Sequence, residues 1–149
     1  MQHEKPLDQS RLQVETNLEA VTEVVLPWFE QFTSPLLPQQ FSGECKLAFV
    51  EGFTNAVRHA HKGLPQTTPI ELELKVFADC LEMRILDHGE PFDLQEKLQE
   101  KLQALCNEDY DPVRDEGGRG LIFMHQLMDE LSYVRLPDER NCLLLRKQR

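Results

Sequence analysis

Two short runs in which apolar and charged residues alternate constrain the fold of this chain more than any other feature. The first run covers residues 70–76 and the second covers residues 81–87. A period of two places the apolar side chains on one face of a strand and the charged ones on the other. Because Ala78-Asp79 lies between the runs, the pair predicts a β-hairpin with one face toward a core.

The other elements follow from helical periodicity, capping residues and breakers. Thr16 or Asn17 is expected to cap the first helix, with Glu19 at capping-box spacing from Thr16. Gly63 is expected to stop the second helix. The expected elements beside the hairpin are a strand over 11–14, helices over 17–32, 40–61, 94–105 and 117–131, and strands over 132–136 and 141–146. This order predicts an α+β fold with one layer of helices on a mostly antiparallel sheet.

Size, charge and cysteine spacing narrow the class of protein. A chain of 149 residues suits one domain spanning 1–149, and its net charge of −10 argues against nucleic acid, whose phosphates it would repel. No apolar run is long enough to cross a bilayer, and the first residues lack the layout of a secretory signal. The 4 cysteines are scattered, which favours reduced thiols over zinc or disulfides. We therefore expect a cytoplasmic protein that binds neither nucleic acid nor membrane.

Glu51 and Asn55 form the first candidate site. They lie four residues apart on the second expected helix, so their Cβ atoms should be about 5–6 Å apart on one face. Carboxylate and amide oxygens at that separation suit Mg²⁺, which takes one or two protein oxygens together with water and phosphate. Asn55 fits as the metal ligand, and Glu51 then remains as a general base toward an attacking hydroxyl.

Two further motifs extend the candidate site toward a nucleotide. Asp87 follows the inward phase of the second hairpin strand, and a buried carboxylate needs a partner such as a ligand amine. Gly117-Gly-Arg-Gly120 precedes a helix, where backbone N–H groups and the helix dipole suit phosphate. The polar stretch between the two motifs has the length of a lid or binding loop.

Each motif also has an ordinary structural alternative. Glu51 and Asn55 are equally compatible with an exposed helix surface, and Asp-His-Gly with a plain turn. Glu51, His59 and His61 could suggest a transition-metal site, but such a site is disfavoured because His61 should point away from the other two. Arg114 and Arg119 could neutralise phosphate charge or remain solvated.

The three motifs together resemble those of the anti-sigma-factor serine kinases. These kinases belong to the ATPase superfamily of gyrase, Hsp90, histidine kinases and MutL. The resemblance covers about residues 11–147. It is carried by Glu51-x-x-x-Asn55-Ala, Asp87-x-Gly89-x-Pro91-Phe92-Asp93 and Gly117-Gly-x-Gly120-Leu-x-x-Met-x-x-Leu-Met128-Asp129-Glu130. The Pro-Phe-Asp and Leu-Met-Asp-Glu continuations point to the anti-sigma branch.

The resemblance implies a Bergerat-type two-layer α/β sandwich, with three helices over one face of a mostly antiparallel, mixed sheet. It implies that ATP and Mg²⁺ bind between the long helix and a lid over about 90–116. In that family, Glu51 would be the catalytic base, Asn55 the Mg²⁺ ligand and Asp87 the acceptor for the adenine amino group. The residues expected to line the nucleotide are Gly89, Gly117, Gly118, Arg119, Gly120 and Leu121.

The resemblance also implies a function and partners. The expected activity is ATP-dependent phosphorylation of a serine on a small antagonist protein. The second expected partner is a sigma factor or a similar regulatory target, which the kinase would sequester, and a homodimer is expected. The alternative is a regulatory module that binds nucleotide and partners without phosphoryl transfer. Retention of Glu51 favours the kinase, because a pure binder would not need a base beside the metal.

Overall fold

The structure, a computed structural model, describes residues 5–107, 109 and 118–149. Its elements are β1 (Asp8–Glu15), η1 (Val21–Val25), α1 (Leu26–Thr33), α2 (Gln39–Asn55), η2 (Ala56–Ala60), β2 (Pro69–Val76), β3 (Cys80–Asp87), α3 (Leu94–Ala104), α4 (Gly118–Leu127), β4 (Glu130–Arg135) and β5 (Asn141–Gln148). The segments η1 and η2 are π-helical: η1 continues directly into α1, and α2 continues directly into η2. The strands form one sheet in the order β1-β2-β3-β5-β4.

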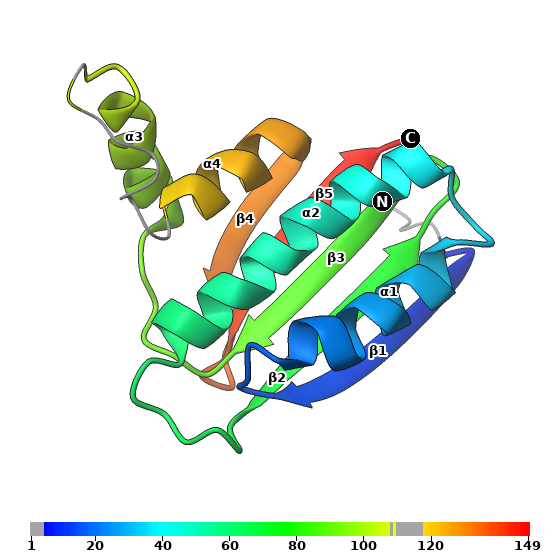
Figure 1. Ribbon diagram of the computed structural model, residues 1–149, viewed down its shortest axis with the longest axis horizontal. Helices are drawn as coiled ribbons and strands as arrows, with labels where there is room; N and C mark the ends of the chain where they lie inside the picture. Colours follow the sequence, from blue (N-terminus) through cyan, green and yellow to red (C-terminus); the bar gives the residue numbers. More distant parts are fainter. Residues whose placement is uncertain (1–4, 108, 110–117) are drawn as a thin grey trace.

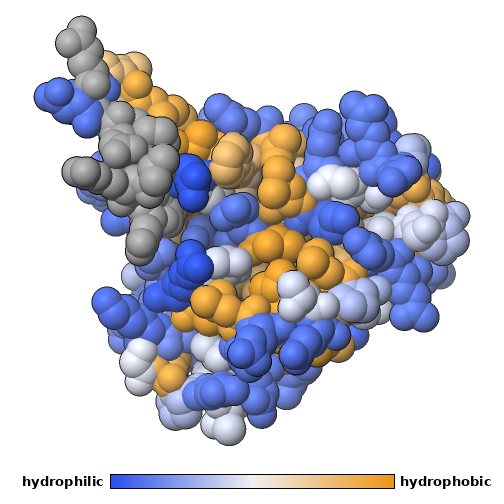
Figure 2. Space-filling view, in the orientation of Figure 1, coloured by the Kyte–Doolittle hydropathy of each residue, from blue (hydrophilic) through white to orange (hydrophobic). Residues whose placement is uncertain are grey.

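The molecule has two layers, and the predicted fold class is confirmed. Helices α1, α2 and α4 cover one face of the sheet, whereas α3 stands beyond the end of α4 (Figure 1). All four strand pairings among the described strands are antiparallel, so the mixed sheet that the resemblance implied is wrong for these strands. The helix-covered face shows apolar side chains between the helices and hydrophilic ones around them (Figure 2).

The hairpin of β2 and β3 forms as its alternating residues predict. Its apolar side chains, Ile70, Leu72, Leu74, Leu81, Met83 and Ile85, are all buried in the core. Glu73 points to the opposite face, where it forms ion pairs with Arg11 at 2.7 Å and with Lys75 and Arg84 at 3.3 Å. Alternation therefore separates an apolar core from a charged open face within the same strands.

The prediction that Thr16 caps the first helix is wrong. Its hydroxyl donates to the carbonyl oxygen of Thr68 at 2.6 Å instead, so it is committed to a contact across the chain. The alternative, Asn17, does accept a hydrogen bond from the Glu19 amide at 2.9 Å. Regular helical structure begins at Val21.

The long second helix has the predicted extent but changes its winding near the end. α2 ends at Asn55, and the last turn before His61 is the π-helix η2. The His61 amide donates to the carbonyl oxygen of Ala56, five residues earlier, at 2.8 Å. Single π-helical turns of this kind occur frequently at functional sites.

The third long helix ends earlier than predicted. α4 stops at Leu127, and Leu131, expected within it, lies in β4. The Asp129 amide already bonds to the carbonyl oxygen of Arg146 at 2.9 Å, so pairing with β5 captures this segment. Over residues 5–107, 109 and 118–149, no helix has both the length and the apolar character that crossing a bilayer requires.

Gly52 explains how closely α2 lies on the sheet. It is buried against the sheet. A Cβ atom there would lie 2.7 Å from Ile85 Cδ1 and 3.0 Å from Leu143 Cδ2. Any larger residue would therefore push the helix that carries Glu51 and Asn55 away from the strands that carry the rest of the site.

Candidate functional site

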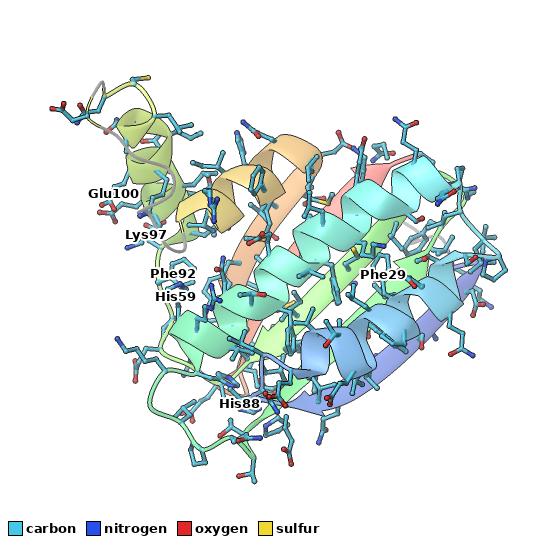
Figure 3. All side chains as sticks on the ribbon, in the orientation of Figure 1. Phe29, His59, His88, Phe92, Lys97 and Glu100 are labelled. Carbon is cyan, nitrogen blue, oxygen red and sulfur yellow. The ribbon has the colours of Figure 1, made fainter. Side chains whose placement is uncertain are left out.

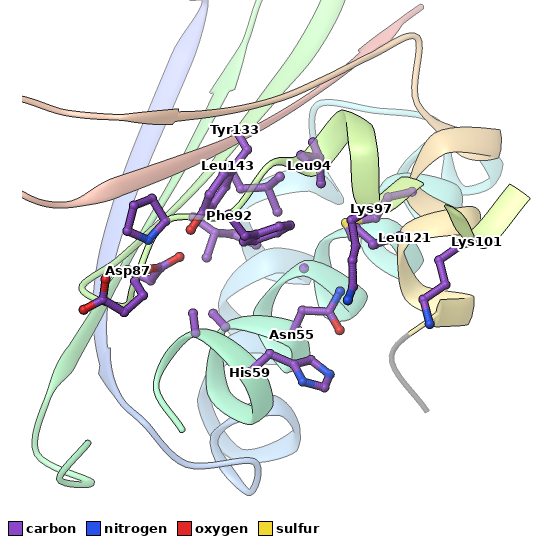
Figure 4. Close-up of a pocket in the computed structure, with 17 residues that line it drawn as sticks. Asn55, His59, Asp87, Phe92, Leu94, Lys97, Lys101, Leu121, Tyr133 and Leu143 are labelled. Carbon is purple, nitrogen blue, oxygen red and sulfur yellow. The ribbon is translucent and has the colours of Figure 1, made fainter. Parts of the chain in front are cut away.

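A cavity of about 420 Å³ opens where α2 and η2 end, beside α3 and α4 (Figure 4). Its lining residues come from these helices, the inner face of the sheet and the turn after β3. They are Gly52, Asn55, Ala56, His59, Ala60, Ile85, Asp87, Glu90, Pro91, Phe92, Leu94, Lys97, Lys101, Leu121, Met124, Tyr133 and Leu143. The all-side-chain view places His59, Phe92 and Lys97 at this same end of the molecule (Figure 3).

The first and third predicted motifs meet at Gly120. A Cβ atom on Gly120 would lie 2.9 Å from Glu51 Oε2 and 3.2 Å from Asn55 Nδ2. The first turn of α4 therefore lies directly against the two polar side chains of α2. Asn55 and Leu121 line the cavity, whereas Glu51 and Gly120 adjoin it.

The other glycine-motif residues have different placements. Gly118 and Arg119 begin α4, and Arg119 is exposed and does not line the cavity. Gly117 and Arg114 lie outside the described residues, as does part of the predicted lid over 90–116. The described part of that lid consists mainly of α3, whose first turn is capped by Asp93 accepting from the Glu96 amide at 3.0 Å.

Asp87 is buried at the end of β3 with 3 % exposure, as its inward phase predicts. Its Oδ1 atom accepts hydrogen bonds from the Gly89 amide at 2.9 Å and from Asn141 Nδ2 at 2.8 Å. Both bonds use the same oxygen. The carboxylate is thus held at the cavity wall by two neutral donors. Among the described residues, no cation forms an ion pair with it.

Two residues that support Asp87 were missed in the sequence. Asn141, fully buried, donates to Asp87 Oδ1 and also to the carbonyl oxygen of Gly89 at 2.8 Å. Arg135 donates to that same carbonyl at 3.1 Å. The strand register brings them there, because Asn141 is paired with Asp87 on one side and with Arg135 on the other. Extending the period of Leu143 and Leu145 back by two would have placed Asn141 inward.

Tyr133 and Phe92 form the wall beside Asp87. Their ring centroids are 4.5 Å apart at an interplanar angle of 38°, within the usual range for aromatic pairs. Burial, and then the negative charge of Asp87, raise the pKa of Tyr133 above its ordinary value. Its hydroxyl is buried, and hydrogen bonding to the nearby Asp87 carboxylate also raises the pKa of the phenol.

Cationic side chains gather at the opposite end of the cavity. Lys97 and Lys101 reach in from α3, and His59 faces them from η2 beside Asn55 (Figure 4). Burial lowers the pKa of His59, and the nearby charges of Arg58 and the three lysines at 97, 62 and 101 lower it further. A protein with a net charge of −10 thus concentrates positive charge where its polar site opens.

Gly89 packs against the end of η2. A Cβ atom on it would overlap the carbonyl group of Ala60 and lie 2.7 Å from its carbonyl carbon. Both sides of that contact are backbone, so no side-chain rotation can relieve it. Gly89 therefore fixes the distance between the turn after β3 and the helix that carries Asn55.

The close contact of Gly89 makes a prediction about stability. We expect Gly89→Ala to lower the free energy of unfolding by about 1–3 kcal/mol, through overpacking of backbone against backbone. Gly43→Ala is the matched control, because nothing lies within 4 Å of a Cβ atom there. In the interior of α2 it should instead raise stability by about 0.5–1 kcal/mol. Denaturant unfolding of both variants checks this, and equal effects would contradict the packing described.

Known proteins with similar sequences belong to the family that the motifs resemble. The family described as the histidine kinase-like ATPase domain matches residues 14–147. The chain is 40% identical over 88 residues to the serine-protein kinase RsbW of Bacillus licheniformis, covering 59% of this chain and 54% of the relative. It is 38% identical over 89 residues to RsbW of Listeria innocua, covering 60% and 55%. It spans about half the length of these curated relatives.

A solved structure shares the fold. The SiaB–SiaC complex from Pseudomonas aeruginosa contains a chain that superposes with a TM-score of 0.63 at 14% identity, over 94% of this chain and 89% of that one. The RsbW matches confirm the resemblance to the anti-sigma-factor serine kinases that the three motifs predicted. Since the family match takes in nearly the whole sequence, the chain belongs to the histidine kinase-like ATPase domain family.

Proposed function

We propose that this protein is an ATP- and Mg²⁺-dependent protein-serine kinase that acts as an anti-sigma-type regulatory switch. The observation that carries the proposal is that the separate motifs meet at one cavity. Asn55, Asp87 and Leu121 line it, and Gly120 brings Glu51 against its edge. The similarity to serine-protein kinases named RsbW supports the same activity.

The adenine would bind at the Asp87 end of the cavity. Asp87 accepts hydrogen bonds from Gly89 and Asn141 on Oδ1, and its Oδ2 would accept from an exocyclic amino group. The Tyr133 hydroxyl, buried beside it, supplies a second polar group. Phe92, Leu143 and Ile85 line the same region and supply the apolar surface on which a purine ring would pack.

The phosphates and Mg²⁺ would bind at the other end. Asn55 supplies the amide oxygen that a hard cation prefers, and Glu51 stands beside it. Gly120 leaves no room for a side chain between α4 and these two residues, so the backbone of α4 can approach phosphate closely. Lys97 adds positive charge at this end. These residues fit the metal, which when bound would neutralise charge on the transferring phosphoryl group.

Glu51 is the proposed catalytic residue of the transfer. Its carboxylate takes the proton of a serine hydroxyl as the serine oxygen bonds to the γ-phosphorus of ATP. The bond between that phosphorus and the bridging oxygen breaks, and the electron pair leaves with ADP. Phosphoryl transfer needs mainly positioning and charge stabilisation, which Asn55, Lys97 and the amides of α4 can provide.

We place the protein in a partner-switching system. Its substrate is a serine on a small antagonist protein, its second partner is a sigma factor or a similar effector, and it acts as a homodimer. The second candidate function is a module that binds nucleotide to shape its surface and transfers nothing. Glu51 beside Asn55 and Gly120 favours the kinase, because nucleotide binding alone requires no base there.

Labelled ATP distinguishes the two functions. The protein is mixed with Mg²⁺, ATP labelled at the γ-phosphate and purified candidate antagonists, and the products are separated by mass. A kinase transfers label to a serine of one candidate. If ATP binds and no candidate acquires label, the kinase proposal is wrong and the binding module stands. If ATP does not bind at all, both proposals are wrong.

Lys97 provides a further prediction about the phosphate end. Lys97 lines the cavity and makes no ion pair with another described residue. We expect Lys97→Ala to weaken ATP binding about tenfold, because a charge-assisted contact is lost, and to leave adenosine binding unchanged. Lys62→Ala is the matched control, since Lys62 contributes to the local potential without lining the cavity. Calorimetric titration measures both, and an equal loss in the two variants would contradict a direct contact.

A further inference from the structure

His61 is the buried member of the four histidines that the structure describes. It is 2 % exposed, whereas the other three are exposed. Its Nε2 atom is 2.8 Å from the His88 amide nitrogen, and its Nδ1 atom is 2.8 Å from Thr16 Oγ1. Thr16 Oγ1 in turn donates to the carbonyl oxygen of Thr68 at 2.6 Å. His61 therefore joins the end of β1 to the turn that follows β3.

These partners determine the protonation state of His61. A backbone amide can only donate, so Nε2 must accept the His88 N–H and cannot carry a proton. The single proton of the neutral ring is then on Nδ1, from which it is donated to Thr16, whose own proton goes to Thr68. Every donor and acceptor in this series of hydrogen bonds is satisfied. A second proton, on Nε2, would face the His88 N–H and break the hydrogen bond between them.

The His88 amide lies between the two site residues of the second motif. Asp87 precedes it, and Gly89 follows it in contact with Ala60 of η2. Four contacts hold this turn. Asn141 and Arg135 donate to the Gly89 carbonyl, the Ala60 backbone lies beneath Gly89, and His61 accepts from the His88 amide. The π-helical turn η2 places His61 under that amide.

We propose that His61 is a positioning residue for the nucleotide site: neutral, it anchors the His88 amide and keeps Asp87 and Gly89 in their binding geometry, and protonated, it releases them. The inference rests on the nucleotide binding proposed above. It assigns to this chain a nucleotide affinity that falls on acidification because of one residue that does not line the cavity.

The sign of the effect follows from the groups that act on His61. Burial lowers its pKa below the usual 6.5, the neighbouring His88 lowers it too, and Asp87 raises it. The titratable group from β3 is thus Asp87, and the group from the following turn is His88, whose ring centroid is 6.1 Å away. Because this pKa is lowered, the contribution of His61 is fully present above pH 6.5 and is lost only as the pH falls through the lowered pKa of the folded protein.

The test compares wild type with His61→Gln, whose amide oxygen can accept from His88 and whose amide nitrogen can donate to Thr16 at every pH. The affinity for ADP with Mg²⁺ is measured between about pH 8 and pH 5. We expect both proteins to bind alike at the alkaline end. On acidification, wild type should lose about fivefold more affinity than the variant, the effect of one hydrogen bond. His61→Leu, without an acceptor, should bind as weakly at the alkaline end as acidified wild type.

Titration of the ligand and of His59 is controlled separately. Ligand protonation affects wild type and His61→Gln equally. His59 lines the cavity, and its protonation would strengthen phosphate binding, so His59→Gln should enlarge the acid loss. His125→Gln, exposed on α4, should change nothing.

Two outcomes would overturn the inference without touching the proposed function. One is an identical pH dependence of ADP binding in wild type and His61→Gln. The other, independent of nucleotide and of how variants fold, is a nitrogen NMR spectrum of wild type showing the His61 proton on Nε2 at the alkaline end. Absence of ADP binding by wild type at the alkaline end would instead refute the proposed function.

Discussion

Asn55→Ala should abolish the Mg²⁺-dependent part of nucleotide binding. Removal of residues that only support a metal ligand typically costs 10–100-fold in affinity, so loss of the ligand itself should cost about 100-fold or more. The fold should survive, because Asn55 is only partly buried on α2 and alanine favours a helix by about 0.5 kcal/mol over asparagine. Calorimetric titration with ATP, with and without Mg²⁺, measures the loss.

Asn17→Ala serves as the control for Asn55→Ala. Asn17 is remote from the cavity lining and uses its side chain in a hydrogen bond to the Glu19 amide. Its replacement should lower stability by about 1 kcal/mol, the usual contribution of one hydrogen bond, and leave ATP affinity unchanged. Unaltered Mg²⁺-dependent affinity in Asn55→Ala would remove Asn55 from the site and with it the proposed position of the metal.

Glu51→Gln should separate binding from transfer. The amide keeps the size of the side chain next to Gly120 but cannot take a proton from the serine hydroxyl. We expect ATP binding to persist while phosphorylation of the antagonist slows by about 10²–10⁴-fold, the usual contribution of a general base. Single-turnover transfer of labelled phosphate, measured at saturating ATP, isolates that step.

Glu44→Gln is the matched control for the base. Glu44 lies on the same helix and pairs with Lys147 at 3.3 Å at a partly exposed surface, so its charge should matter little. Transfer at the wild-type rate is expected. If Glu51→Gln also transfers at that rate, Glu51 is not the base; if neither variant nor wild type transfers, the non-catalytic alternative gains.

Local patterns predicted the parts of the site that depend on one strand or one helix. The period of β3 placed Asp87 inward, and a spacing of four placed Glu51 and Asn55 on a common face. These inferences need only the geometry of a single element. The contacts of Gly120 and Gly89 confirm that the three motifs come together, although their roles toward ATP and Mg²⁺ remain predictions.

The parts that sequence reasoning missed depend on how elements pair. Asn141 reaches Asp87 only because β5 lies beside β3 in one register, and no local pattern records which strands are neighbours. His61 was expected to point away from Glu51 and His59, but helical spacing could not show that the π-helical turn directs it under His88. Thr16 matched a capping motif, yet its hydroxyl binds two competing partners, His61 after η2 and Thr68 before β2.

The position of α3 means that different parts of the fold carry the residues at the two ends of the cavity. Asp87 lies in β3 and accepts a hydrogen bond from Asn141 of the neighbouring strand β5. Lys97, in contrast, lies on the short helix α3, which packs through the buried side chains of Leu94 and Leu98. Under the proposed function, the base would therefore bind against strands of the sheet, and the phosphates would bind beside a helix that stands outside the two layers.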